Sequence, residues 1–382
     1  MKTLLFIVPS RANCGTNSSF SAIYNVLKDQ YKIDILTIKS SGKGIYEFLN
    51  NSFTSNILEA YYGDFKGLRG KTKMLSVCLK IFKHIAYALH INSDDMISKS
   101  AAGSIERKKH YDFIIGFQEG LAMRVASNFS NPNKLTWVHC DYERAVPPEC
   151  NELQYYLKFK SIVCVSNFTR DKFVSRYPNL GNRTCCIYNL TDTDKVLQLS
   201  AEPIEDDRFR NDCFTIISAG RMDPVKQFSQ IPEIAKEIAD AGYKFRWYIL
   251  GGPGNDEFKK IQIAILNYDV GEFVVLLGNK SNPYPYFKAS NLYVSTSLSE
   301  ACPMVFNEAR ICGIPIVSSD FGSAVEFIRN KVDGLIGPLC ELPNLIISII
   351  TDEDYYKKSD KSNTAILNLN NEIKNKLALL FA

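Results

Sequence analysis

The stretch that decides the fold is SLSEACPMVFNEARICGIPIVSSDFGSAVEFI, residues 297–328. Two acidic residues, Glu300 and Glu308, stand on either side of a proline-led turn that opens a short helical pattern. Gly313 and Pro315 then end that helix and lead into an apolar strand. The stretch therefore predicts a loop, a short helix and a buried strand, with one carboxylate in the loop and the other inside the helix.

The start of this helix is a predicted anion site. Pro303 suits the first helical position, because the N–H that proline lacks would be unpaired there. The main-chain N–H groups that follow, those of Met304, Val305 and Phe306, would then face the loop. Such a helix start attracts phosphate through aligned donors and the positive end of the helix dipole. With carboxylates nearby to accept hydroxyl hydrogen bonds, the pattern indicates a nucleotide-sugar site.

At this point the chain resembles a known family. The Glu-x7-Glu spacing, with the later Gly-x-Pro and the pair Gly322 and Glu326, is similar to the donor-site signature of family 4 glycosyltransferases, also called glycosyl transferases group 1. These are retaining enzymes of the GT-B fold. The resemblance implies that Glu300 orients the sugar hydroxyls and that Glu308 holds the nucleotide ribose. It also implies a UDP-linked sugar as the first choice of donor.

The loop departs from the family pattern at two positions. Ala301 stands where the family usually has glycine, and Cys302 stands where an aromatic residue is frequent. Ala301 requires ordinary backbone angles, so we expect the loop that holds the donor hydroxyls to differ in shape. The choice among glucose, galactose and their N-acetyl forms therefore stays open.

A second phosphate anchor lies earlier in the chain. The predicted strand FTIISAG (214–220) ends in Gly220 and is followed by Arg221 and Lys226. Ligands of open α/β sheets bind at the carboxyl ends of the strands, and a guanidinium with an ammonium group suits a diphosphate. These residues resemble the Gly-Arg-x(4)-Lys motif of the same family, which holds the donor diphosphate. A surface ion pair at a helix start is the alternative.

Short apolar runs alternate with helical or loop stretches, as parallel sheets with crossover helices require. The runs are 4–8, 34–38, 112–117, 135–139 and 161–166 in the first half, and 214–220, 246–252, 274–278, 292–297 and 314–320 in the second. The fold class is therefore α/β with two Rossmann-like domains, and the resemblance implies the GT-B arrangement. We expect an N-terminal domain over 1–198, a linker over 199–212, a C-terminal nucleotide-sugar domain over 213–365, and a helix over 366–382 that packs back on the N-terminal domain.

The composition limits where the protein works and what it binds. No apolar run approaches the ~20 residues that cross a bilayer, and eleven cysteines without paired spacing fit a reducing cytoplasm. Residues 1–190 hold 25 Lys and Arg against 15 Asp and Glu, whereas residues 191–382 hold 20 against 26. The basic half lacks interleaved base-reading motifs, so we expect no nucleic-acid partner. An anionic membrane surface fits it better.

Residues 71–91, KTKMLSVCLKIFKHIAYALHI, predict an amphipathic helix. One face gathers Leu75, Cys78, Phe82, Ile85, Ala86 and Leu89, and the opposite face gathers Lys73, Lys80, His84 and Tyr87, with Lys83 at the edge. Two interpretations are open. Either the apolar face packs on the core and the basic side is solvated, or the segment lies on an anionic membrane, where each Lys contributes ~1 kcal/mol.

Three features of the first half are further candidates for the site. WVHCDY (137–142) resembles the family segment whose His reaches the transferred sugar, which makes His139 a catalytic candidate, although a lone His after a strand is more often structural. The loop PSRANCGTNSSF (9–20) partly resembles the family's glycine loop and would approach the diphosphate through Gly15 and Thr16. Ser166 fits a helix cap or a residue of the acceptor cleft.

Neither metal nor cofactor is expected. The Asp-x-Asp run at 192–194 has the form with which single-domain GT-A transferases bind Mn²⁺, but its neighbours are ordinary turn residues. The adjacent cysteines at 185–186 have no second pair with which to bind zinc. A site with Arg221, Lys226 and a helix start already offsets the charge of a diphosphate.

The expected activity is transfer of a hexosyl or N-acetylhexosaminyl unit from a nucleotide sugar to a glycan or lipid-linked acceptor. The resemblance implies a retaining, metal-independent enzyme of bacterial surface polysaccharide assembly, in the cytoplasm at the inner face of the cell membrane. Two other classes remain open. One is a non-catalytic GT-B subunit that binds a nucleotide sugar or a partner transferase, and the other is a GT-B epimerase or phosphorylase acting on soluble sugars.

Overall fold

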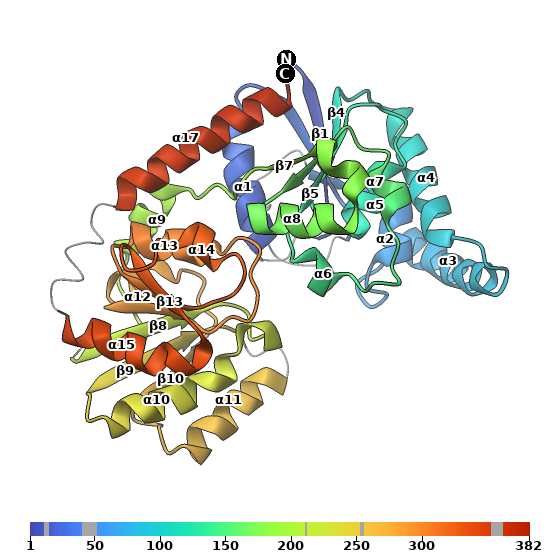
Figure 1. Cartoon of the computed structure of the whole chain (residues 1–382). Helices are drawn as coiled ribbons and strands as arrows, with labels where there is room; N and C mark the ends of the chain where they lie inside the picture. The colour runs from blue at the N-terminus through green and yellow to red at the C-terminus, as the bar shows by residue number, and fades with distance from the viewer. Residues whose placement is uncertain (11–14, 40–51, 211, 253–255, 353–361) are drawn as a thin grey trace. The chain divides into compact units, whose positions relative to one another are not determined.

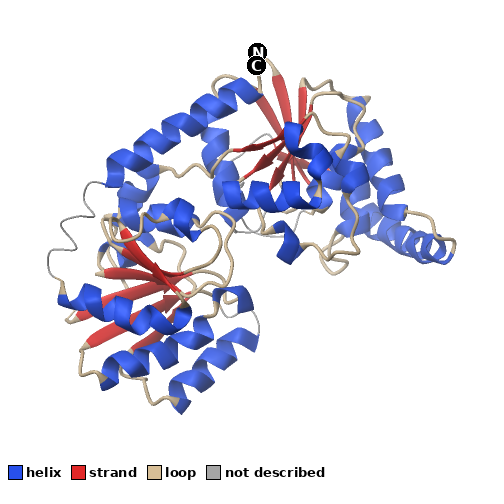
Figure 2. Cartoon of the chain, viewed as in Figure 1, coloured by secondary structure: helices blue, strands red, loops and turns tan. Residues whose placement is uncertain are grey.

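The computed structural model describes residues 1–10, 15–39, 52–210, 212–252, 256–352 and 362–382. It divides the chain into two compact units, the first made of Met1–Leu190 with Ile373–Ala382 and the second of Thr191–Glu372. In each unit, helices cover a sheet whose strands all run parallel (Figure 2). The predicted α/β class with two Rossmann-like domains is confirmed.

The sheet of the first unit has, among the described residues, the order β3-β2-β1-β4-β5-β6-β7 (Figure 1). Its strands are β1 (Thr3–Val8), β2 (Lys32–Thr37), β3 (Ser52–Thr54), β4 (Phe113–Gly116), β5 (Lys134–Val138), β6 (Ser161–Cys164) and β7 (Thr184–Cys186). Its helices are α1 (Gly15–Leu27), α2 (Asn56–Tyr62), α3 (Gly70–Ala88), α4 (Ser93–Glu106), α5 (Leu121–Ser127), α6 (Tyr142–Ala145), α7 (Leu153–Tyr156), α8 (Asn167–Arg176) and the 3-10 helix η1 (Pro178–Arg183). The central strands β4 and β5 are buried throughout, because parallel sheets are covered on both faces.

The sheet of the second unit has, within the same limits, the order β10-β9-β8-β11-β12-β13. Its strands are β8 (Phe214–Ala219), β9 (Phe245–Leu250), β10 (Val274–Gly278), β11 (Leu292–Ser295), β12 (Ile316–Ser319) and β13 (Gly334–Gly337). Its helices are α9 (Thr193–Ser200), α10 (Ile231–Asp240), α11 (Asp256–Asn267), α12 (Tyr284–Lys288), α13 (Met304–Ile311), α14 (Ala324–Phe327), α15 (Leu342–Thr351) and the first part of α17 (Ser362–Leu380), with 3-10 turns η2 (Pro224–Lys226), η3 (Phe228–Gln230) and η4 (Leu339–Glu341).

Every apolar run expected to be a strand overlaps one in the structure. The sequence did not predict β3, β7 and β13, which form edges of the two sheets. Strands β3 and β7 have only three residues each, and β13 has two apolar residues between two glycines, so none of them forms the apolar run of four or more residues from which the other strands were predicted. Ser166 caps α8 as one of its two interpretations predicted, since its side chain accepts a hydrogen bond from the Thr169 N–H at 3.0 Å.

The amphipathic segment forms helix α3, but its apolar residues do not all face the core. Ser76 and Ala86 are buried, whereas Ile81 and Ile85 are more than half exposed. The predicted core-facing set is therefore divided, with Leu75, Cys78, Ile85 and Leu89 exposed. The reason is that α3 packs on α2 and α4 through a narrow face, which leaves most of its circumference in solvent.

The segment expected to be a linker, 199–212, lies inside the second unit. The Asp206 carboxylate pairs with Arg208 at 2.6 Å and with Lys280 at 2.5 Å. Arg208 also donates to the carbonyl oxygens of Leu276 and Leu277 at 3.2 and 2.9 Å. The hydrogen bonds that Arg208 and Lys280 donate to the Asp206 carboxylate hold its pKa well below its usual range. They fasten the segment to β10, and the division between units falls before α9 rather than after it.

The end of the chain belongs to the first unit. Ile373 and Leu377 of α17 are buried, and the Phe381 ring lies 5.5 Å from the Phe113 ring and 6.4 Å from the Phe6 ring. Lys2 donates to the Phe381 carbonyl oxygen at 2.9 Å. Within the described ranges, none of the helices combines the length and the apolar content that a membrane span requires.

Candidate functional site

The candidate residues from the second half of the sequence lie at one edge of the sheet in the second unit. Strands β8 and β11 are neighbours at the point where the strand order reverses. Ligands of open α/β sheets bind outside the carboxyl ends of the strands at such a point. Gly220 and Lys226 follow β8, and Glu300 and α13 follow β11. The topology therefore places both predicted phosphate-binding elements, the residues after β8 and the start of α13, at the edge where ligands of such sheets bind.

Lys226 and Glu300 form the centre of this edge. The Lys226 ammonium donates to Glu300 Oε1, and each side chain is 17% exposed. The Ser297 hydroxyl donates to the same carboxylate oxygen at 2.8 Å, and the Ser323 hydroxyl donates to the Glu300 carbonyl oxygen at 2.6 Å. The contact therefore places a cation and a carboxylate side by side, both only partly exposed, where a ligand of this sheet would bind.

The loops that carry these two residues are tied to each other. The Thr296 hydroxyl donates to the Lys226 carbonyl oxygen at 2.7 Å, and the Leu298 N–H donates to the Val225 carbonyl oxygen at 2.8 Å. The Asp223 side chain caps η2 by accepting from the Val225 N–H at 3.1 Å. Two loops far apart in sequence thus form one rigid rim.

Glycines keep the neighbouring backbones close. A Cβ atom on Gly251, directly after β9, would lie 2.3 Å from the Gly220 carbonyl oxygen. A Cβ atom on Gly220 would lie 3.2 Å from Lys226 Cε. No side chain fits at Gly251 without moving the backbone of the loop that leads to Lys226.

A cavity of about 200 Å³ opens beside this rim. It is lined by Ala219, Gly220, Leu250, Gly251, Asn279, Lys280, Pro283, Phe287, Val305 and Glu308. The Tyr284 hydroxyl donates to Glu308 Oε1 at 3.2 Å, and burial raises the pKa of Glu308 to about 7 although Tyr284 and Lys195 favour its ionised form. The cavity thus offers an apolar wall with a few polar groups, as small-molecule sites do.

Sequence reasoning missed Gly251, Asn279, Lys280 and Tyr284. The Gly251-Gly252 pair after a strand and the Asn-Lys pair after VVLLG (274–278) were visible signals, because residues after neighbouring parallel strands share one edge of the sheet.

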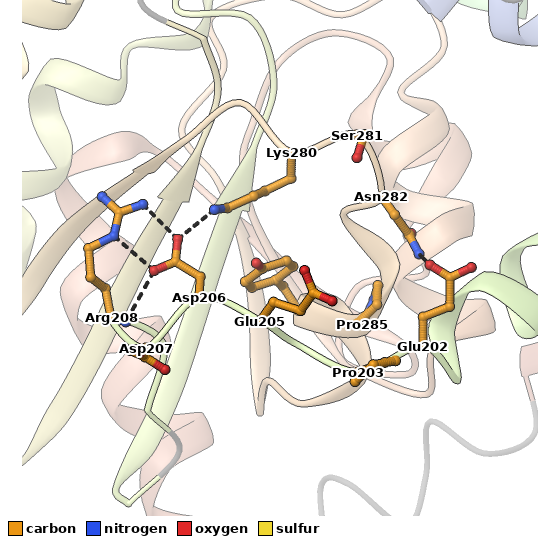
Figure 3. A pocket seen from close by; sticks show the side chains of 11 residues that line it. Glu202, Pro203, Glu205, Asp206, Asp207, Arg208, Lys280, Ser281, Asn282 and Pro285 are labelled. Atoms are coloured by element: carbon orange, nitrogen blue, oxygen red, sulfur yellow. Dashed lines mark hydrogen bonds and ion pairs between the residues drawn. The ribbon is translucent and has the colours of Figure 1, made fainter.

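A second cavity, of about 770 Å³, lies between the segment 202–208 and the residues 280–286 (Figure 3). Lys280 lines both cavities.

The start of α13 differs in detail from the prediction. Pro303 is the N-cap, and Met304 is the first helical residue. The Phe306 N–H is already used, since it donates to the Pro303 carbonyl oxygen at 3.1 Å. Among the described residues, no acceptor is recorded for the N–H groups of Met304 and Val305, so these two remain as donors for an anion. Arg221 is exposed, and among the described residues its guanidinium has no recorded partner.

The first unit holds the other candidates. His139 follows β5, its main-chain N–H donates to Glu119 Oε2 at 2.7 Å, and its ring lies 4.9 Å from the Phe117 ring. Burial lowers the pKa of His139 to about 3, so the imidazole is neutral near pH 7. Its Nε2 atom is buried without a hydrogen-bond partner among the described residues.

Glu119 is a further candidate that the sequence did not single out. It lies between β4 and α5, and burial raises its pKa despite the hydrogen bond from the His139 N–H. The only sequence signal was an acidic residue before Gly120 at the end of a strand. Gly15 and Thr16 begin α1, whereas residues 11–14 of the predicted glycine loop lie outside the described residues.

The Asp-x-Asp run serves local structure. The Asp192 side chain caps α9 by accepting from the Lys195 N–H at 3.1 Å. Across the described ranges, no three His, Cys, Asp or Glu side chains gather as metal ligands do.

Comparison with known proteins gives three kinds of match. Residues 202–365 match the family model described as glycosyl transferases group 1. The chain is 31% identical over 210 residues to an uncharacterised glycosyltransferase of Methanocaldococcus jannaschii, covering 54% of this chain and 48% of that protein. It is 26% identical over 186 residues to an uncharacterised protein of the cps region of Klebsiella pneumoniae, covering 47% of this chain and 48% of that protein. The chain thus spans about half the length of the curated relatives it matches. The crystal structure of Anabaena HepE in complex with UDP-glucose matches with a TM-score of 0.74 at 17% identity, covering 99% of this chain and 100% of that one.

Proposed function

We propose that the protein transfers a hexosyl or N-acetylhexosaminyl unit from a UDP-sugar to a glycan or lipid-linked acceptor, because residues 202–365 match the model of the glycosyl transferases group 1 and the fold is similar to that of the HepE structure. The observation that carries the proposal is the Lys226–Glu300 pair, fixed at the ligand-binding edge of the sheet. It sets a cation for a diphosphate beside a carboxylate for sugar hydroxyls.

The second unit supplies the groups that stabilise the leaving diphosphate. As the bond between the anomeric carbon and the phosphate oxygen breaks, negative charge grows on the leaving group. Lys226, the exposed Arg221 and the N–H groups of Met304 and Val305 are the donors assigned to it. A fixed array of donors can lower such a barrier by several kcal/mol. Glu308 lies in the adjoining cavity and is assigned to the nucleotide ribose.

The hexose meets groups of a different kind. Glu300 accepts hydrogen bonds from its hydroxyls. Family resemblance alone supports the assignment of His139 to the transferred sugar. Family resemblance supports retention at the anomeric carbon, with an oxygen of the leaving phosphate taking the proton of the acceptor hydroxyl.

Donor and acceptor are proposed from the relatives. UDP-glucose is bound in the HepE structure, which supports a UDP carrier. The relative from a cps region supports a place in bacterial surface polysaccharide assembly, at the inner face of the cell membrane. The non-catalytic subunit remains the second candidate, since the same pocket would bind a nucleotide sugar without turnover.

A panel of radiolabelled nucleotide sugars incubated with a membrane extract tests the proposal. We expect label from one UDP-sugar to enter an acceptor with the wild-type protein and not with Glu300→Gln. Tight binding of a donor without transfer to any acceptor, in the presence of the extract, would favour the non-catalytic subunit. Absence of both binding and transfer across UDP, GDP and ADP sugars would refute the assignment.

Activity should persist in excess EDTA. The physical reason is that Lys226, Arg221 and the two main-chain donors already oppose the charge of the leaving diphosphate, which is the role that a divalent cation fills elsewhere. The measurement is the initial rate of transfer with and without chelator. Loss of activity with EDTA and its recovery with Mn²⁺ would contradict this expectation.

Donor affinity should rise with pH through the ionisation of Glu308. Because its pKa in the folded protein is about 7, the carboxyl is mostly protonated at pH 6 and mostly ionised at pH 8. The ionised form is the stronger acceptor for ribose hydroxyls, so we expect UDP-glucose to bind about fivefold more tightly at pH 8 than at pH 6. Calorimetric titration measures this ratio.

The same group gives the opposite sign for stability. A carboxyl whose folded pKa lies above its unfolded value stabilises the free protein at low pH, and this contribution is lost as the pH rises through 7. Glu308→Gln should reduce the pH dependence of both the donor affinity and the stability of the free protein. A Glu308→Gln variant whose donor affinity keeps the wild-type pH dependence would show that another group titrates.

A further inference from the structure

Helix α3 presents an apolar stripe to solvent. Met74, Val77, Ile81 and Ile85 are exposed by 69%, 45%, 56% and 54%. They follow one another at intervals of three or four residues, which places them on one face of the helix. Single exposed apolar residues are ordinary, but a continuous exposed row marks an interaction surface.

The stripe is not needed to attach the helix. Ser76 and Ala86 are the buried residues of α3, and Leu79 and Phe82 pack partly buried against the core of the first unit. At 100° per residue, Ser76, Leu79 and Ala86 lie on the face opposite the stripe, and Phe82 lies at the edge of that face. The helix is therefore fixed by one side while the other side remains without a partner in the described chain.

Basic side chains flank the stripe without acidic neighbours on the helix. Residues 70–88 contain no Asp or Glu, and within the described residues no salt bridge is recorded for Lys71, Lys73, Lys80 or Lys83. The ammonium groups of Lys73 and Lys80 lie 5.0 and 4.4 Å from the centroid of the Phe65 ring, which holds both beside the helix. Lys71, Lys73 and Lys80 are the lysines beside the stripe, whereas Lys83 lies on the opposite side of the helix, with its ammonium 5.0 Å from the centroid of the Tyr61 ring and in a cavity that Asp94 also lines.

We propose that α3 binds the surface of an anionic phospholipid bilayer, with Met74, Val77, Ile81 and Ile85 among the acyl chains and the flanking lysines among the headgroups. An amphipathic helix of this composition lies in the plane of the interface. Lysines near an anionic surface contribute about 1 kcal/mol each. The very exposed Tyr87 at the end of the helix suits the headgroup layer, where aromatic rings gather.

Charge decides between a bilayer and a second copy of the chain. A twofold contact through the stripe would bring the lysine row of one helix close to that of its partner, and like charges at an interface are unfavourable. An anionic bilayer offers the opposite charge over the whole length of the helix. The proposal concerns the first unit alone and does not depend on which sugar is transferred.

Co-sedimentation with phosphatidylcholine vesicles, with and without phosphatidylglycerol, tests the proposal on the full chain. We expect the wild type to sediment with the anionic vesicles and to be released at high salt. Ile81→Glu with Ile85→Glu should weaken partitioning about tenfold or more, because two apolar side chains no longer enter the lipid. The matched control is Ile263→Glu with Leu266→Glu on α11, where both residues are similarly exposed, and it should bind as the wild type does.

A second variant guards against misfolding. Lys71→Glu, Lys73→Glu and Lys80→Glu together leave the stripe intact and should abolish the preference for anionic vesicles. UDP-glucose binding, measured in parallel, reports on the second unit, so failure of the proposed function is distinguished from failure of lipid binding. Equal sedimentation of wild type and both α3 variants would overturn the proposal. So would wild-type self-association, seen by sedimentation velocity and lost with Ile81→Glu and Ile85→Glu, in a protein that does not bind vesicles.

Discussion

Replacing Lys226 with alanine is expected to lower kcat/KM for the donor by about 100- to 1000-fold, the range found when one preorganised donor to a developing charge is removed. Two effects act together. The leaving diphosphate loses a cation fixed beside it, and the Glu300 carboxylate, only 17% exposed, loses its partner. The measurement is steady-state kinetics with a UDP-sugar, together with the midpoint of thermal unfolding.

Lys236 provides the matched control. Its ammonium pairs with Asp240 one turn along α10, and its side chain is 43% exposed. Surface pairs of this kind contribute little, so Lys236→Ala should leave both the kinetics and the unfolding midpoint close to wild type. If Lys226→Ala kept wild-type kcat/KM, the assignment of the site would be wrong.

Replacing Gly251 with alanine is expected to disturb both the stability and the nucleotide affinity of the second unit. The new methyl group would lie 2.3 Å from the Gly220 carbonyl oxygen, so one of the two backbones must move. Overpacking of this kind costs about 1–3 kcal/mol, which corresponds to a fall in the unfolding midpoint of several degrees. Because Gly220 leads directly to Arg221 and Lys226, UDP-glucose should also bind more weakly.

The next residue is the control. A Cβ atom on Gly252 would lie 3.5 Å from Asn279 Cβ, which is an ordinary van der Waals distance. Gly252→Ala should therefore keep the wild-type unfolding midpoint and affinity in thermal melts and calorimetric titrations. Equal effects of the two substitutions would show that loss of glycine flexibility, rather than the close approach to Gly220, is responsible.

The strands of the second unit and helix α13 could be predicted from the sequence, because the residues that start and end these elements lie within or next to them. Pro303 and Gly313 bracket α13 in the structure as they do in the sequence, and the apolar runs became the strands of the sheet. The sequence did not predict which main-chain N–H groups at the start of α13 remain without an acceptor inside the helix. Whether the Phe306 N–H turns inward to the Pro303 carbonyl oxygen depends on the angle at which the chain enters the helix.

Features that depend on distant residues could not be predicted. The acidic segment 199–212 has the composition of a linker, and only the fold brings Lys280 next to Asp206. A helical wheel sorts the residues of α3 into faces, but it does not show which face α2 and α4 will cover. Glu119 and His139 become partners because β4 and β5 are adjacent in the sheet, a fact of topology that neither motif contains.

The contact between Lys226 and Glu300 has a consequence for the turnover cycle. An intact donor can separate the two groups, because its diphosphate replaces the carboxylate and its hexose hydroxyls replace the ammonium. The spent carrier left after transfer offers only the first of these replacements. Re-formation of the lysine–carboxylate contact therefore competes with the spent nucleotide, and we expect it to hasten product departure, the step that limits many enzymes.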